Sequence, residues 1–177
     1  MSGYKVLISE QQIQKRIAEL GAEISQKLKS SSDKPLVVIG VLKGSFIFLA
    51  DLVRKISTPL EIDFVEASSY GAGTTSSGEV KLTRDIKIPI AGRDVILVED
   101  IVDTGHTISF LTQHLAAHKP RSISVASLLF KPARQIKEVK IDFLGFTIDD
   151  YFVIGYGLDL NNKFREIKEV VIYEPSK

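Results

Sequence analysis

Three acidic residues and a short turn of small residues stand together between Val95 and Thr107, in the stretch VILVEDIVDTGHT. The apolar run at its start is typical of a buried strand, and the turn at its end is typical of a phosphate site. The acids between them, Glu99, Asp100 and Asp103, would repel a phosphate. The stretch therefore predicts a ligand with two kinds of group, one anionic and one that carboxylates bind.

The turn from Asp103 to Thr107 has the chemistry of an anion site. A glycine before a helix start presents backbone N–H groups and the positive end of the helix dipole, and Thr104 and Thr107 add hydroxyl donors. The turn is not a Walker A loop, because the lysine and the glycine spacing are missing. A capped helix N-terminus, with Asp103 or Thr104 as the cap, is the alternative, and the turn by itself leaves both open.

Glu99 and Asp100 directly follow the apolar run, where an unpaired carboxylate is costly. Two kinds of partner suit them, a metal ion such as Mg²⁺ or the hydroxyls of a sugar. A phosphate on the turn and hydroxyls on the acids together describe a ribose 5-phosphate. An acidic loop paired with lysine or arginine is the remaining alternative.

Predicted helices and strands alternate around this stretch. An amphipathic helix is expected from Ser9 to about Lys29, with Ser9 and Gln12 in a capping box, and a second from Phe46 to Ile56. A third is expected from Thr107 to about His118. The run LVVIGVL is continuous and β-branched, which is typical of a strand buried on both faces. Further strands are predicted at LEIDFVEA (60–67), VKLT (80–83), VILV (95–98), SISVASLL (122–129), DFLGFTI (142–148), YFVIGY (151–156) and EVVIY (169–173).

The order strand, helix, strand over 36–56 and over 95–129 predicts an α/β domain with a parallel sheet. No repeat or linker divides the 177 residues. In open parallel sheets, ligands bind beyond the carboxyl ends of the strands. The loops Lys43–Ser45 and Glu99–Thr107, and the segment that begins with Lys131, all fall at such ends and are candidate site segments.

The composition excludes several classes of function. A formal net charge of +1, from 23 basic and 22 acidic residues, gives no overall attraction to nucleic acid or to an anionic membrane. There are no cysteines, so disulfides, thiolate chemistry and cysteine-ligated metal sites are excluded. The first ten residues lack the apolar core of a signal peptide, and no apolar run reaches membrane length. A cytoplasmic location is expected.

The stretch VILVEDIVDTGHT resembles the phosphoribosyl-pyrophosphate (PRPP) signature of type I phosphoribosyltransferases: an apolar strand, two acids, two apolar residues and then D-T-G-x-T. The rest of the chain resembles the hypoxanthine–guanine branch of that family. The motifs that carry this similarity are LKGS at 42–45, SSYG at 68–71, SSGEVK at 76–81, LLFKPAR at 128–134 and FVIGYGLDLNNKFR at 152–165.

The resemblance implies a fold and a reaction. Residues 1–177 would form one phosphoribosyltransferase domain, an α/β fold whose mostly parallel central sheet is flanked by helices. A small hood would come from the N-terminal segment and from about 143–177. The reaction would be the Mg²⁺-dependent transfer of 5-phosphoribose from PRPP to hypoxanthine or guanine, which forms IMP or GMP and releases pyrophosphate in purine salvage.

The resemblance also assigns residues to the sugar and its phosphates. Asp103 is implied as general base near N7 of the purine, or as the group that stabilises the developing charge. A cis peptide bond at Leu42–Lys43 is frequent in the family. The other implied contacts are Glu99 and Asp100 with the ribose hydroxyls, Asp103, Thr104, Gly105, His106 and Thr107 with the 5′-phosphate, and Lys43, Gly44 and Arg165 with pyrophosphate.

Purine and metal contacts follow from the same resemblance. Lys131 would donate to O6 and so favour 6-oxopurines over adenine. Phe152 would stack on the purine, and the backbone of Val153 would read its edge. For Phe152 alone, a core aromatic in a strand is the commoner role. The carbonyl of Asp159 would meet the 2-amino group of guanine. The implied Mg²⁺ ligands are Asp159, Glu99 and Asp100.

The segment 68–79 is implied as a lid that excludes water during transfer, with Ser69 and Tyr70 as its closing residues. Relatives form dimers or tetramers, so a homodimer or homotetramer is expected. His106 stands at the variable position of D-T-G-x-T, where an imidazole near a phosphate would make binding depend on pH. His114 and His118 are interpreted as surface or helix-end residues, and Asp149–Asp150 as a solvated turn.

Two other functions remain open at this point. The same PRPP chemistry would serve a different base, xanthine–guanine or even uracil. A PRPP-sensing regulator that binds RNA or DNA is a candidate from another class. The near-zero net charge counts against it, as does the presence of Asp103 together with Lys131.

Overall fold

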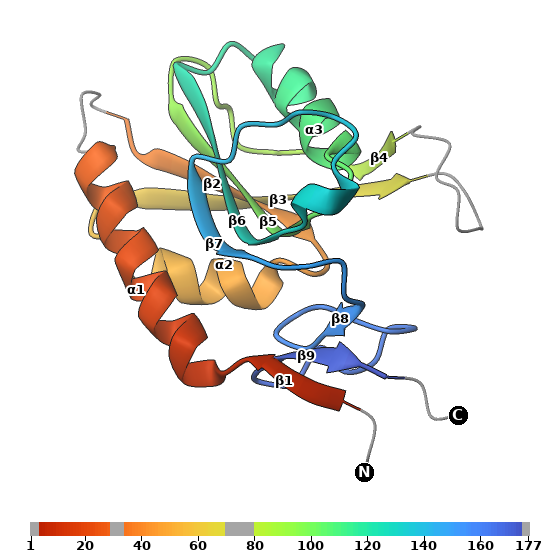
Figure 1. Cartoon of the computed structure of the whole chain (residues 1–177). Coiled ribbons are helices and arrows are strands. Elements are labelled where there is room, and N and C mark those ends of the chain that lie inside the picture. The colour runs from red at the N-terminus through yellow and green to blue at the C-terminus, as the bar shows by residue number, and fades with distance from the viewer. Residues whose placement is uncertain (1–3, 29–33, 70–79, 175–177) are drawn as a thin grey trace.

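A computed structural model describes residues 4–28, 34–69 and 80–174 of the chain. Six of the strands form a central sheet in the order β4-β3-β2-β5-β6-β7 (Figure 1). The pairs β3–β2, β2–β5, β5–β6 and β6–β7 are parallel, and β4 is antiparallel to β3 at one edge. The strands are β2 (Leu36–Leu42), β3 (Leu60–Ser69), β4 (Val80–Arg84), β5 (Asp94–Val102), β6 (Ser122–Phe130) and β7 (Phe143–Thr147).

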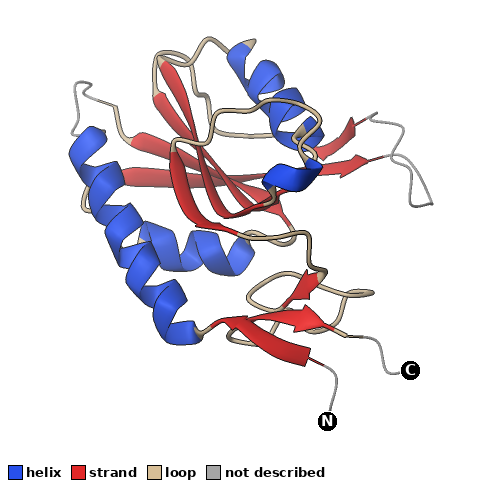
Figure 2. Cartoon of the chain, in the orientation of Figure 1, coloured by secondary structure: helices blue, strands red, loops and turns tan. Residues whose placement is uncertain are grey.

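Helices cover both faces of this sheet. The helices α1 (Glu10–Lys27) and α2 (Phe46–Val53) lie on one face, and α3 (His106–Ala116) lies on the other (Figures 1 and 2). A short 3-10 helix, η1 (Pro132–Arg134), follows β6. Along β2 and β5 successive side chains enter the two cores alternately, since alternate residues of a strand point to opposite faces. The segments 36–42 of β2 and 95–98 of β5 are therefore apolar throughout.

The predicted first helix is confirmed, with its cap. Ser9 accepts a hydrogen bond from the backbone N–H of Gln12, and the Gln12 side chain accepts one from Ser9, which completes the capping box. Ile13, Ile17 and Leu20 form its buried stripe. The second helix ends at Val53, earlier than predicted, and the third runs from His106 to Ala116.

A small antiparallel sheet forms a hood beside the central sheet, and it contains the first and last described strands of the chain, β1 and β9 (Figure 1). Its order is β1-β9-β8, with β1 at Tyr4–Ile8, β8 at Val153–Ile154 and β9 at Val170–Tyr173. The sequence analysis expected a hood from both terminal segments but did not predict β1 as a strand. The predicted fold, a mostly parallel α/β sheet with a terminal hood, is confirmed. In the described parts of the chain, no helix is long and apolar enough to span a membrane.

One predicted boundary in the acidic stretch is wrong. Glu99 and Asp100 belong to β5 and not to a loop, because β5 continues to pair with β6 as far as Val102 and Phe130. Of the segment expected to act as a lid, 70–79 lies outside the described residues, and with it Tyr70; Ser69 ends β3.

Candidate active site

Three loops meet at one edge of the central sheet. The strands β2, β5 and β6 are parallel neighbours, so their carboxyl ends lie side by side. The loops that follow them are 43–45, 103–107 and 131–134. The sequence analysis named Lys43–Ser45, Glu99–Thr107 and the segment that begins with Lys131 as candidate site segments, and the sheet order explains why they converge.

The loop after β2 packs directly against the acids of β5. Its first peptide bond, Leu42–Lys43, is cis. The buried hydroxyl of Ser45 donates a hydrogen bond to the carbonyl of Val41 at 2.6 Å, which ties the end of the loop to β2. A Cβ on Gly44 would overlap the Asp100 carboxylate, so only glycine allows this approach. The candidate pyrophosphate loop and the candidate ribose acids therefore border the same space.

Arg165 reaches this space from the hood. Its Nη1 donates to the carbonyl of Gly157 at 2.6 Å, and its Nη2 lies 2.7 Å from Asp159 Oδ1. Gly157 has φ +100°, and a Cβ there would overlap the carbonyl of Gly44. The positive charge of Arg165 also acts on Asp100, whose pKa it lowers against the larger effect of burial. The hood thus brings Arg165 and Asp159 to the loop that contains Gly44.

Glu99 and Asp100 are neighbouring buried carboxylates whose negative charge is not balanced by the positive side chains around them. Glu99 is 6% exposed, and its described hydrogen bond comes from the N–H of Asp100 at 3.2 Å. Burial raises the pKa of Glu99 well above its ordinary value, and the charge of Asp100 raises it further. Burial also raises the pKa of Asp100, although its carboxylate accepts from the N–H of Ile101 at 2.8 Å. Such a pair is relieved by a cation or by hydroxyl donors, which fits an oxygen-ligand metal such as Mg²⁺.

The turn 103–107 surrounds a small cavity at the start of α3. Gly105 has φ +84°, and a Cβ on it would overlap the carbonyl of Lys137. The carbonyl of Thr104 accepts the N–H groups of Ile136 and Lys137 at 3.0 and 2.9 Å, which fixes the turn from outside. The residues that line the cavity are Glu99, Ile101, Val102, Asp103, Thr104, Gly105, Thr107 and Ile108.

His106 Nε2 is a buried polar atom at this turn with no hydrogen-bond partner among the described residues, whereas the buried Asp103 Oδ1 has only its ion pair with Arg134. Backbone N–H groups of the first helical turn also have no partner within a helix, and they carry partial positive charge. The alternative of a helix cap formed by a side chain is wrong, because Gly105 is the N-cap residue and no side-chain hydrogen bond caps the helix. The turn presents free donors to an anion.

Four charged side chains form a chain of ion pairs across the loop after β6. Asp103 Oδ1 lies 3.0 Å from Arg134 Nε, and Arg134 Nη1 lies 3.6 Å from Asp150 Oδ1. The same Asp150 oxygen is 3.7 Å from Lys131 Nζ. Lys131 is 6% exposed, and its backbone N–H donates to the carbonyl of Val102. The candidate purine lysine is thereby connected to the candidate catalytic acid.

The candidate stacking residue lies at the edge of the hood. Phe152 is 52% exposed and meets Tyr173 edge-on, with ring centroids 6.1 Å apart, so the alternative of a core aromatic is wrong. Val153 is buried at the start of β8. An exposed aromatic face is a suitable surface for a planar ring.

The sequence analysis missed two residues of this arrangement. Asp150 was interpreted as part of a solvated turn. It is exposed, but it pairs with both Lys131 and Arg134. Arg134 was quoted within a motif and given no role. No sequence spacing relates Asp150 to Lys131, because the contact depends on the return of the chain through β7.

Residues 7–161 of the chain match the phosphoribosyl transferase domain family. The chain belongs to the phosphoribosyltransferase family. Among the curated phosphoribosyltransferases, the hypoxanthine-guanine phosphoribosyltransferase of Bacillus subtilis is 45% identical over 172 residues, which cover 97% of this chain and 94% of that protein. The hypoxanthine phosphoribosyltransferase of Salmonella typhimurium is 43% identical, over 94% and 93% of the two chains.

A crystal structure of a phosphoribosyltransferase has the same fold. The hypoxanthine-guanine phosphoribosyltransferase of Bacillus anthracis aligns with a TM-score of 0.89 at 42% identity, over 97% of this chain and 99% of that one. This phosphoribosyltransferase therefore falls in the hypoxanthine–guanine branch, and its predicted class, a phosphoribosyltransferase of purine salvage, is confirmed.

Proposed function

We propose that this chain transfers 5-phosphoribose from PRPP to hypoxanthine or guanine and releases pyrophosphate. The observation that carries the proposal is the chain of ion pairs from Asp103 to Lys131, which begins at the turn 103–107. It unites a candidate phosphate site, a carboxylate and a buried amine donor at the carboxyl ends of the strands. A 6-oxopurine and a ribose phosphate together need these three groups.

PRPP would be held by two loops and by the hood. The 5′-phosphate would sit on the turn from Asp103 to Thr107, where Thr104, Gly105 and Thr107 line the cavity and would offer backbone N–H groups and hydroxyls, with His106 as a further expected contact. Pyrophosphate would lie between the Lys43–Gly44 loop and Arg165, whose guanidinium suits bidentate contact with phosphate oxygens. Glu99 and Asp100 would accept hydrogen bonds from the ribose hydroxyls.

The residues present also fit a magnesium ion. Asp159, Glu99 and Asp100 offer the oxygen ligands that Mg²⁺ prefers, and when bound the ion would neutralise charge on the leaving pyrophosphate. Asp159 now pairs with Arg165 and accepts from the N–H of Asn162 at 2.7 Å. Its carboxylate would therefore divide its contacts between Arg165 and the ion.

Asp103 would act on the purine as it departs from or joins the sugar. Either of its predicted roles, proton acceptor near N7 or stabiliser of developing positive charge, needs the carboxylate in its charged form. The guanidinium of Arg134 lies 3.0 Å from this carboxylate and would hold it in position. Lys131 would donate to O6 while Phe152 stacks on the ring and the backbone of Val153 reads its edge, which favours hypoxanthine and guanine over adenine.

We further propose that the chain works as one domain and assembles as a homodimer or homotetramer, which light scattering of the purified protein would test. Neither nucleic acid nor membrane is a proposed partner, and the cytoplasmic location stays a prediction.

A panel of bases tests the proposed reaction. Purified protein with PRPP and Mg²⁺ would be offered hypoxanthine, guanine, xanthine, adenine and uracil in turn, with pyrophosphate release as the readout. We expect turnover with hypoxanthine or guanine and little with adenine or uracil. Preferred turnover of xanthine or uracil would move the chain to another substrate class. Turnover of none of them, together with tight RNA binding, would contradict an enzymatic function.

A further inference from the structure

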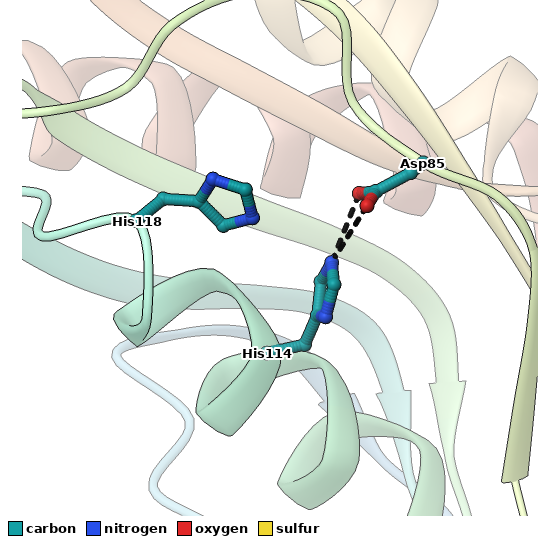
Figure 3. A group of neighbouring side chains, drawn as sticks. All are labelled: Asp85, His114 and His118. Atoms are coloured by element: carbon teal, nitrogen blue, oxygen red, sulfur yellow. Dashed lines mark hydrogen bonds and ion pairs between the residues drawn. The ribbon is translucent and has the colours of Figure 1, made fainter.

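A second group of metal-ligating side chains lies at the C-terminal end of α3 (Figure 3). Asp85 comes directly after β4, His114 is in the last turn of α3, and His118 follows that helix. One ligand atom from each side chain lies within 4.8 Å of the other two. None of the three lies in the loops of the candidate active site, and the sequence analysis interpreted both histidines as surface residues.

Local geometry brings the three side chains together. His114 and His118 are four residues apart, so a helical course places them on the same face. Their rings meet edge-on with centroids 5.4 Å apart, and Phe110 stacks on His114 at 6.3 Å from the other side. Asp85 is held in place because its Oδ1 accepts the N–H of Ile86 at 2.7 Å. His114, the histidine that contacts the carboxylate, is thus held in place by Phe110 of its own helix.

His114 and Asp85 face each other in a way that suits two ligands of one metal ion. His114 Nε2 lies 3.0 Å from both carboxylate oxygens, so the imidazole nitrogen and the carboxylate face the same point. A metal ion can bind at such a point, because a neutral imidazole and a carboxylate both present lone pairs to it. Figure 3 shows the His118 ring beside this point, on the same side of the helix.

We propose that Asp85, His114 and His118 form a binding site for Zn²⁺. Two imidazoles and one carboxylate are a common zinc ligand set, with water in the fourth position. Zinc–ligand bonds of about 2.0–2.1 Å put tetrahedral ligand atoms roughly 3.3 Å apart. The observed cluster is wider than this, and the exposed side chain of His118 can close the difference by rotation. Imidazole ligands favour Zn²⁺ over Mg²⁺, so this site differs in chemistry from the carboxylates of the candidate active site.

Bound zinc would tie α3 to the segment that follows β4. The phosphate turn lies at the opposite end of α3, whose 11 residues span about 16 Å. The ion would therefore act by holding the helix end in place, and it would take no part in transfer. Zinc would bind the folded chain, which holds the three ligands together, more tightly than the unfolded chain. Zinc binding would therefore raise the midpoint of thermal unfolding.

Calorimetric titration of the full chain with Zn²⁺ tests this site. A large excess of Mg²⁺ in both solutions would occupy the active-site carboxylates. We expect one saturable site per chain. His118→Ala, a change at an exposed position, should weaken zinc binding at least tenfold, and Asp85→Asn should weaken it severalfold. His106→Ala is the matched control, since it removes the third histidine of the chain at the other end of α3, and it should leave the zinc affinity unchanged.

Two results would overturn the proposal. One is the lack of saturable zinc binding, or binding that His118→Ala leaves unchanged. The other is an Asp85→Asn variant that binds as tightly as the unchanged chain, because the site would then be a surface histidine pair only. Thermal unfolding gives a second readout, in which zinc should raise the midpoint of the unchanged chain and not that of His118→Ala. His118→Ala should also keep full transfer activity, so failure here is distinct from failure of the proposed reaction.

Discussion

Lys131 and Asp150 form one end of the chain of ion pairs that reaches Asp103, the candidate catalytic acid. Asp150 Oδ1 lies 3.7 Å from Lys131 Nζ, while Arg134 contacts both Asp150 and Asp103. Lys131 is buried and Asp150 is half-exposed, so the acid holds the ammonium group from the solvent side. The two groups expected to recognise the purine and to act on it are therefore not independent.

Asp150→Asn should weaken purine recognition. The change removes the charge that orients Lys131, and we expect kcat/KM for hypoxanthine to fall by up to about fivefold, since exposed ion pairs contribute about 1 kcal/mol or less. The KM for PRPP should stay the same, because Asp150 does not contact the turn or the Lys43–Gly44 loop. Asp149→Asn is the matched control, a neighbouring exposed acid, and should have no effect. Equal kinetics for the two variants would show that Asp150 is only a surface charge.

Gly44→Ala should damage the PRPP side of the site. A Cβ at Gly44 would overlap Asp100, so the loop or the carboxylate must move. Displacements of about 1 Å at reacting groups cost on the order of 100-fold in rate, and we expect a loss of that size in kcat/KM for PRPP. Gly92→Ala is a useful comparison, because no atom lies within 4 Å of a Cβ there, although its positive φ favours glycine. Steady-state kinetics with PRPP varied would distinguish the two, and a fully active Gly44→Ala would refute the close packing.

Glu99→Gln should stabilise the free protein at neutral pH and weaken ligand binding. The folded-state pKa of Glu99 is raised by burial and by Asp100, so its charge opposes folding once the pH exceeds the ordinary carboxyl value of about 4.3. Removing that charge should raise the free energy of unfolding at pH 8 by about 1–3 kcal/mol. The gain should disappear as the pH falls towards 4, where the carboxyl is protonated in both states.

Asp94→Asn provides a control of opposite sign in the same strand. The Arg121 hydrogen bond lowers the pKa of Asp94, with a further contribution from Ser122, so the charged form stabilises the folded state above its unfolded pKa. Its replacement should destabilise the protein at pH 8, and the loss should shrink as the pH falls through the lowered value. Urea unfolding at several pH values measures both variants. Destabilisation by Glu99→Gln at pH 8 would mean that a cation or donor already satisfies the acid.

The sequence was sufficient for the parts of the site that depend on local order. Apolar runs, the capping box at Ser9 and the D-T-G-x-T turn each occupy one continuous segment, and strand order then brings their ends together. The approach of Gly44 to Asp100 and the contact of Lys131 with Asp150 depend on packing between distant segments. No spacing in the chain encodes them. The strand β1 was missed because it is short and largely exposed, and it is held by its pairing with β9.

The extension of β5 through Glu99 and Asp100 was missed for a related reason. Acidic residues are uncommon in strands, so the pattern indicated a loop. The pairing of β5 with β6 continues past them and places the acids in the sheet itself. A rigid strand holds their carboxylates more firmly than a loop would, so the groups are already in position before a ligand binds.

The most direct test of the central claim is the rate of IMP formation from PRPP and hypoxanthine with Mg²⁺, measured for the unchanged chain and for Asp103→Asn. We predict turnover by the unchanged chain and a decrease of about 10²–10⁴-fold in kcat for the variant, the range for the loss of a general acid or base. PRPP binding, measured separately by calorimetry, should change little. Equal turnover by both proteins, or no IMP from the unchanged chain, would contradict the account.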